Sequence, residues 1–309
     1  MADTTLERAF TRVLWLLRDY LADLVVIGGW VPFLYARCSG DPWSGGHSRT
    51  AEVDILTMPP LPVHGAPLDE TLRAAGLAPA REGGPSAVWN AAAESGEQIE
   101  FLTPHRGIGT TVGTTVHIPG HGQVGAISLS TLELLGQHIT TLTVPVGDFD
   151  GTLHEVSVRV PRLGVYVVHK AATYTARRAH IERPNPKQAK DLVYLHDVMA
   201  ASDVVRQRVE TDLRALWQSG KTKAGTERQT IRTALNNLSR LVGAGRHAPL
   251  VSAAAAELSE RDRITRVDAE ARLLGQLTDL VEIVKNVAAQ HRGPDVRRRM
   301  PPPEPEPGA

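Results

Sequence analysis

Hydrophobic residues in the first third of the chain fall into short blocks whose spacing alternates between that of a helix and that of a strand. Apolar residues return every three or four positions at the start, which predicts a helix over residues 4–21. A β-branched run predicts a buried strand at 24–27, and the pair Gly28-Gly29 predicts a tight turn into a helix over 30–38. The same criteria predict two more strands and a short helix, at 51–57, 98–102 and 68–77. This mixture of elements is typical of an α/β protein.

The pattern changes at Pro161. Between residues 112 and 160, clusters of β-branched residues predict a β-rich region that a helix interrupts at 130–138. Beyond Pro161, helical spacing predicts helices over 163–180 and 186–200 and at least three more before residue 288. The second half is therefore expected to be helical.

Three regions follow from these patterns. We expect an α/β (α+β) domain with a mixed sheet over residues 1–162 and a C-terminal helical bundle over 163–292. Residues 293–309 are rich in proline, arginine and glutamate and lack core-forming residues, which predicts a disordered tail. Residues 39–48 hold three glycines and a proline and are expected to form a loop.

Composition limits the partners and the compartment. The 309 residues are 42% hydrophobic and 22% charged, and 34 basic residues balance 34 acidic ones, so a nucleic acid could be held only by a local basic patch. The single cysteine, Cys38, excludes an intrachain disulfide and suits a reducing cytosol. The sequence contains neither a secretory leader nor a run of about 18 apolar residues that could span a membrane. We therefore expect a cytoplasmic protein without a membrane partner.

Three acidic residues on two predicted strands are the main candidates for chemistry. Glu52 and Asp54 are two positions apart on one strand, which places both carboxylates on the same face. Glu100 lies between two apolar residues on another strand, and if the strands are neighbours, the three carboxylates converge. Carboxylate ligands without cysteine or a close histidine pair favour Mg²⁺ or Mn²⁺ over zinc. Each acid taken alone is more often part of a solvated strand face.

Other candidates surround this group. Gly28 and Gly29 lie at a strand-to-helix turn, where backbone amides can bind phosphate, although such a pair is more often only a turn. Lys170 is flanked by apolar residues in a predicted helix and is either a phosphate ligand or a lysine that reaches out from a buried helix. Lys190 and Asp191 are either functional or ordinary charges near a helix start. A basic stretch beside them comprises Arg162, Arg177, Arg178 and Lys187.

The order of these features resembles the nucleotidyltransferase fold of the DNA polymerase β-like superfamily. That superfamily has a Gly-Gly or Gly-Ser turn, then a strand with two acids at alternate positions, then a later strand with a third acid. The matching residues here are Gly28, Gly29, Glu52, Asp54 and Glu100, and the segment SRTAEVDIL is similar to the superfamily's acidic strand. The first acid is glutamate where the superfamily usually has aspartate, and the loop at 39–48 is an insertion, either a lid or a tolerated extension.

The following segment resembles the bacterial minimal nucleotidyltransferases, which include toxin and abortive-infection types. Those proteins have a helix with a lysine and then a Lys-Asp pair, which correspond here to Lys170 and to Lys190 with Asp191, and the resemblance covers about residues 20–200. It implies transfer of a nucleoside monophosphate from an NTP, ATP included, to a hydroxyl acceptor with Mg²⁺ or Mn²⁺. The resemblance implies that Glu52, Asp54 and Glu100 are metal ligands and that Glu100 also takes the proton of the acceptor hydroxyl. It implies that Gly28, Gly29 and Lys170 bind the triphosphate. Asp191 would orient Lys190 or the acceptor.

The resemblance leaves several partners open. A tRNA or another RNA is the first acceptor class that it implies, followed by a protein side chain or a small molecule such as an aminoglycoside. Toxin-like members imply an antitoxin protein as a further partner. The alternative is a catalytically degenerate member that binds a nucleotide or a protein and tolerates Glu52 for that reason.

Overall fold

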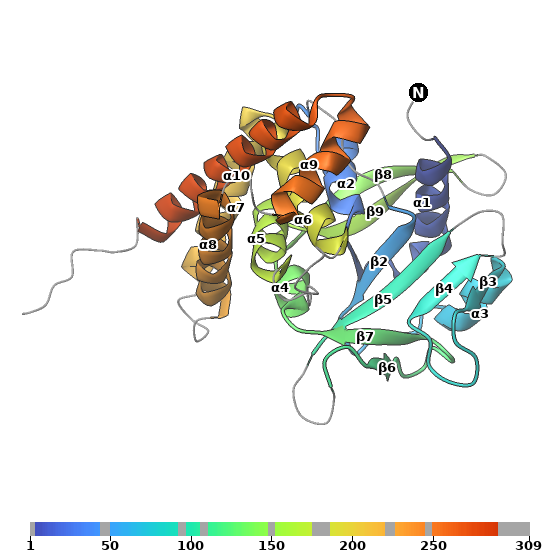
Figure 1. The fold of residues 1–309 in the computed structure, drawn as a ribbon. Helices are drawn as coiled ribbons and strands as arrows, with labels where there is room; N and C mark the ends of the chain where they lie inside the picture. Colours follow the sequence, from blue (N-terminus) through green and yellow to red (C-terminus); the bar gives the residue numbers. More distant parts are fainter. Residues whose placement is uncertain are drawn as a thin grey trace, which may run out of the picture.

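A mixed β-sheet lies at the centre of the N-terminal half in the computed structural model (Figure 1). The structure describes residues 4–43, 50–91, 97–105, 111–147, 152–174, 186–219, 226–244 and 249–289. Five of its strands lie in the order β1-β2-β5-β4-β3, and β7 pairs with both β5 and β6. The β2–β5 and β5–β7 pairs are parallel and the others antiparallel, so the sheet is mixed as predicted. The strand bounds are β1 Leu24–Ile27, β2 Glu52–Thr57, β3 Leu77–Pro79, β4 Val88–Ala91, β5 Gln98–Pro104, β6 Thr115–His117 and β7 Gly125–Leu129.

The central strands bring distant residues into register. β1 is buried along its whole length and runs antiparallel to β2, with Ile27 opposite Asp54. β2 runs parallel to β5, with Asp54 opposite Glu100. Because side chains on neighbouring strands at matched positions point to the same face, this register places the predicted acids together and sets the Gly28 turn beside them.

Several predicted boundaries in the first half differ from those observed. The predicted helix over 4–21 consists of α1 (Thr4–Leu16) followed by a 3₁₀ turn at Arg18–Tyr20, where Tyr20 N–H bonds to the Leu17 carbonyl instead of the carbonyl one residue further back. The helix predicted over 68–77 is α3 (Leu68–Ala74), because Gly76 adopts a positive φ of 82° and the chain then enters β3.

A two-stranded sheet and two helices complete this half. β8 (Ile139–Gly147) and β9 (Leu153–Pro161) form an antiparallel hairpin that contacts α1 and β1, and the Trp15 ring of α1 stacks on the His154 ring at 4.3 Å. α4 (Leu132–Gln137) is the predicted helical interruption before this hairpin. α2 (Trp30–Cys38) follows β1, and its Tyr35 hydroxyl donates to the Pro161 carbonyl at the end of β9. The hairpin is thereby joined to the helix that leaves the central sheet.

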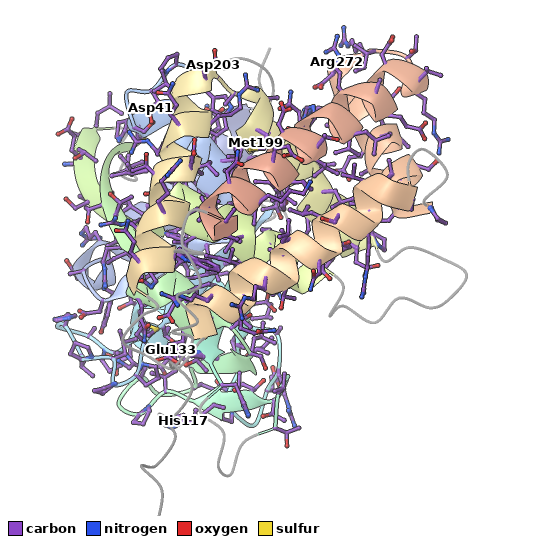
Figure 2. The ribbon with its side chains drawn as sticks, turned by 90° about the vertical axis from the view of Figure 1, so that its left-hand side faces the viewer. Asp41, His117, Glu133, Met199, Asp203 and Arg272 are labelled. Atoms are coloured by element: carbon purple, nitrogen blue, oxygen red, sulfur yellow. The ribbon has the colours of Figure 1, made fainter. Side chains whose placement is uncertain are left out.

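The second half is a helical bundle, as predicted, and it lies to one side of the sheet (Figure 1). Helix α5 leads out of β9 and packs against α6, α7 and α8. A salt bridge of 2.7 Å between Arg208 of α7 and Asp41 ties the bundle to the segment after α2, and Asp41 and Asp203 lie at the same end of the molecule in Figure 2. The helix bounds are α5 Leu163–Thr173, α6 Pro186–Ala200, α7 Asp203–Ser219, α8 Thr226–Ala244, α9 Pro249–Asp262 and α10 Arg266–Ala289.

Buried hydrophobic side chains form one continuous core that extends from the sheet into the bundle. The domain limits at residues 162 and 292 therefore stay predictions. The loop residues beyond position 43, the pair Arg177 and Arg178, and the tail over 293–309 lie outside the described residues. Across the described part of the chain, the helices are too short or too polar to cross a bilayer.

Candidate active site

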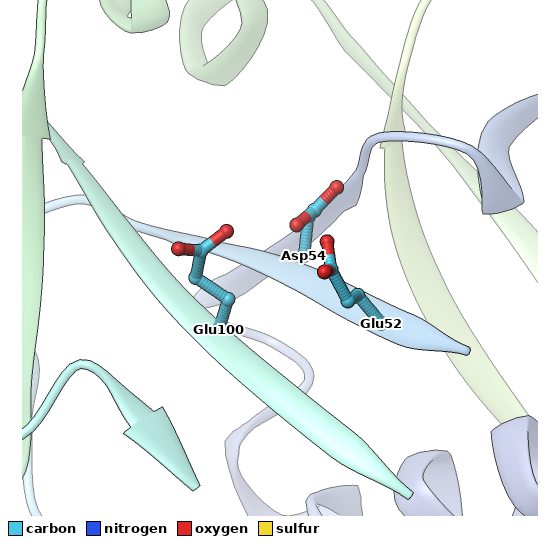
Figure 3. A group of neighbouring side chains, drawn as sticks. All are labelled: Glu52, Asp54 and Glu100. Atoms are coloured by element: carbon cyan, nitrogen blue, oxygen red, sulfur yellow. The ribbon is translucent and has the colours of Figure 1, made fainter. Parts of the chain in front are cut away.

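Three carboxylates meet on one face of the central sheet (Figure 3). Glu52 and Asp54 project from β2 and Glu100 projects from β5, and each offers one oxygen within 4.8 Å of the others. All three side chains are partly exposed, so a ligand can reach them. The alternation of residues along the strands predicted this convergence, and the parallel β2–β5 pairing produces it.

The carboxylate oxygens form a set that suits a hard divalent cation. The cluster contains neither histidine nor cysteine, the ligands that distinguish zinc sites. Burial raises the pKa of Asp54 to about 7, the neighbouring Glu100 carboxylate adds to the rise, and Lys170 opposes it. Three negative charges this close repel one another, so the group favours either a proton or a cation between its members. The residues present therefore fit a bound Mg²⁺ or Mn²⁺ ion.

Gly28 connects β1 to this cluster and has to be a glycine for two reasons. Its φ of 72° lies in the left-handed region that side chains disfavour. A Cβ atom at this position would also overlap the carboxylate of Asp54. The backbone of the turn therefore passes directly against the central acid.

Gly29 and Trp30 begin α2 on the other side of the turn. A Cβ atom at Gly29 would collide with the Tyr194 hydroxyl of α6 and with Thr50, so this position is also restricted to glycine. The Trp30 indole N–H donates to the Glu52 carbonyl at 3.1 Å and its ring stacks on Phe10 at 4.1 Å. The helix N-terminus, with its free amides, is thus held beside the start of the acidic strand.

Lys170 lies on α5 in a buried ion pair. Its ammonium group is 2.7 Å from Asp191 Oδ1 on α6, and both residues are buried. The Tyr166 and Tyr194 rings flank the ammonium, with centroids 5.8 and 5.2 Å away. The sequence had suggested Lys190 or the acceptor as the partner of Asp191; the structure places Asp191 against Lys170 instead, because α5 and α6 pack side by side. Lys170 therefore does not reach outward to solvent.

Two further lysines lie at the exposed edge of the site. Lys187 Nζ is 3.9 Å from Glu52 Oε2, and Lys190 is exposed on α6 in the neighbourhood of Glu257. Ion pairs of exposed lysine side chains such as these contribute little to stability. The predicted basic stretch is described only in part, through Lys187 and Arg162.

A cavity of about 1130 Å³ contains all these groups. Its lining includes every candidate from the sequence, namely Gly28, Gly29, Glu52, Asp54, Glu100, Lys170, Lys190 and Asp191. Its volume exceeds the roughly 300–1,000 Å³ of common small-molecule pockets. The cavity is therefore larger than one small ligand requires.

Sequence reasoning missed several residues of the cavity. Tyr166 lies one helical turn before Lys170 and Tyr194 lies one turn after Lys190, so helical spacing from the lysines was the available signal. Three residues of α8 also line the cavity, and no local pattern connects them to the acids; they are Gln229, Thr230 and Thr233.

Comparison with known protein families matches residues 9–221 to a family described as nucleotidyltransferase. The curated proteins and the solved structures gave no match. The matched range begins inside α1, contains the whole sheet, the three acids and helices α2 to α7, and ends before α8.

Proposed function

The chain belongs to this nucleotidyltransferase family, since the match covers 213 of its 309 residues (9–221), and on that premise we propose that it transfers a nucleoside monophosphate from an NTP to a hydroxyl acceptor with Mg²⁺ or Mn²⁺. The observation that carries the proposal is the convergence of Glu52, Asp54 and Glu100 within 4.8 Å. A cation held by these residues would neutralise charge on the triphosphate and activate the acceptor hydroxyl.

The chain's own residues would bind and orient the triphosphate. The Gly28 and Gly29 amides, at the N-terminus of α2, lie beside Asp54 and suit phosphate oxygens. Lys170 supplies a positive charge that Asp191 fixes in place. Both groups line the same cavity as the three carboxylates, which supports a triphosphate site beside the cation site.

The transfer step needs an acceptor for one proton. The acceptor oxygen forms a bond to the α-phosphorus, the bond between that phosphorus and the bridging oxygen breaks, and pyrophosphate leaves. Glu100 is our candidate for taking the hydroxyl proton, because it faces the β2 pair from a separate strand. Glu52 stands where the superfamily that the sequence resembles usually has aspartate, and its carboxylate lies within 4.8 Å of the other two, which supports a shared role.

RNA, with tRNA first, is the acceptor class that we propose to test first. The size of the cavity and the exposed Lys187 and Lys190 at its edge support a second, anionic substrate. A protein side chain and an aminoglycoside are the next candidates. An antitoxin partner stays a prediction from the resemblance.

Calorimetric titration tests the proposal most directly. Each of the four NTPs is titrated into the wild type and into Asp54→Ala, with Mg²⁺ and with EDTA, and labelled NTPs are then incubated with RNA and protein acceptors. We expect Mg²⁺-dependent binding and transfer in the wild type and loss of both in Asp54→Ala. Asp279→Ala, at an exposed position of α10, is the matched control and should behave as wild type. A folded wild type that binds none of the NTPs would instead favour the degenerate, non-catalytic member of the family.

A further inference from the structure

Helix α8 forms a wall of the cavity although it lies outside the matched part of the chain. The family match ends at residue 221, whereas Gln229, Thr230 and Thr233 line the same cavity as the three carboxylates. The family match therefore does not assign a role to this wall.

The position of α8 is fixed by its contacts with α5. The Tyr174 hydroxyl donates to the Asn237 carbonyl at 3.0 Å. The Asn237 side-chain amide donates to the carbonyls of Ala171 and Ala172, each at 3.1 Å. These buried bonds attach α8 to the C-terminal end of α5, beyond Lys170, so the wall is held rigidly relative to the acids.

Charge is distributed unevenly over the cavity lining. The carboxylates and lysines described above are connected to one another, through the acidic cluster, the Lys170–Asp191 pair and the contact of Lys187 with Glu52. The residues that α8 contributes are a neutral amide and two hydroxyls. His169 of α5 bonds to the Thr131 hydroxyl at 3.1 Å. Among the described residues of the lining, the charged side chains thus come from β2, β5, α5 and α6, whereas α8, α4 and β7 contribute neutral ones. We call these two parts of the lining the charged end and the neutral end of the cavity.

Apolar groups accompany the neutral polar ones. Leu132 and Leu135 of α4 and Ile127 of β7 line the cavity together with the α8 wall. Flat apolar faces and an edge of neutral donors and acceptors are the chemical features of a heterocyclic base. A phosphodiester chain or a polycationic sugar would instead need charged partners.

We propose that the neutral end of the cavity binds the base of the NTP and that Gln229 and Thr233 of α8 determine which base is preferred. The inference rests on the proposed function, because it takes the charged end as the triphosphate site. Gln229 offers both a donor and an acceptor, and Thr233 offers a hydroxyl, which are the groups that distinguish one base edge from another.

The experiment compares Gln229→Ala and Thr233→Val with Thr278→Val, a matched substitution at an exposed position of α10. Calorimetry with Mg²⁺ gives the affinities for the four NTPs and for inorganic tripolyphosphate, which has no base. We expect the ratios among the NTPs to change by about three- to tenfold in the α8 variants, the loss of one neutral hydrogen bond. We expect the tripolyphosphate affinity to stay within about twofold of the wild-type value.

Other outcomes separate the inference from its premise. Equal affinity of the wild type for all four NTPs, or unchanged ratios in both α8 variants, would overturn the inference while the proposed function stands. An equal loss of affinity for NTPs and for tripolyphosphate in the α8 variants would also overturn the inference, because it would assign α8 to binding of the triphosphate. A change only in the rate of transfer to the acceptor would overturn it too, because it would assign α8 to binding of the acceptor. Failure of the wild type to bind either ligand with Mg²⁺ would overturn the proposed function itself.

Discussion

Replacing Asp54 by asparagine should stabilise the metal-free protein at neutral and alkaline pH. The pKa of Asp54 rises from 3.8 to about 7 in the folded protein, because the surrounding protein displaces water from the partly exposed carboxyl and Glu100 lies opposite it. Between these two pH values the folded state holds a proton that the unfolded state has lost, so the unfolding free energy falls as the pH rises and becomes level above about 7. At about 1.4 kcal/mol for each pH unit, the full loss amounts to about 4 kcal/mol.

Urea unfolding at pH 5 and pH 8 in EDTA measures this effect. We expect the wild type to lose about 2.7 kcal/mol more than Asp54→Asn between the two conditions, because only the part of the range between pH 5 and about 7 is sampled. Saturating Mg²⁺ at pH 8 should restore the wild type and leave Asp54→Asn unchanged, because a cation replaces the proton among the carboxylates. Asp279→Asn, at an exposed position, controls for general charge effects. Parallel pH profiles for the wild type and Asp54→Asn would refute the reasoning.

Three further substitutions test other parts of the structure by urea unfolding. Gly28→Ala should cost about 1–3 kcal/mol more than Gly40→Ala, since both glycines have positive φ but only the first would gain a Cβ in overlap with a carboxylate. Lys170→Met should cost about 3–5 kcal/mol, and adding Asp191→Asn should recover more than half, because the first change removes the ammonium beside a buried carboxylate. Burial lowers the pKa of His121, so the wild type should lose more stability than His121→Gln as the pH falls from 7.5 to 5.5, through the ordinary histidine pKa of about 6.5. Equal losses of unfolding free energy in Gly28→Ala and Gly40→Ala would contradict the argument from the Cβ overlap. An unchanged stability on adding Asp191→Asn to Lys170→Met would contradict the argument from the buried ion pair, and matching pH profiles for the wild type and His121→Gln would contradict the argument from the histidine.

The parts of the fold that follow from local patterns were predictable. The alternation around Glu52, Asp54 and Glu100 fixes which way these side chains point, and β1, β2 and β5 are confirmed. β3 and β4 were missed, because strands of three and four residues with Pro79 and Asn90 carry too little pattern. Their order in the sheet depends on pairing between distant segments.

The candidate site was predictable on the sheet and much less so on the helices. The resemblance to the minimal nucleotidyltransferases, which have a lysine in the corresponding helix, pointed to Lys170. Its partner Asp191 is 21 positions further along the chain and contacts it only because α5 packs on α6. The contribution of α8 depends in the same way on Asn237, whose bonds to α5 no spacing in the sequence indicates. Tertiary packing, not local preference, decides these contacts.

The close approach of Gly28 to Asp54 also links the evolution of these two positions. Two constraints act on position 28, the left-handed backbone and the carboxylate of Asp54, and only the second depends on the acid. A lineage that lost the acid at position 54 would release that second constraint, and asparagine, which tolerates positive φ, could then enter at position 28. Paired loss of the glycine and the acid would thus mark descendants that have given up the chemistry.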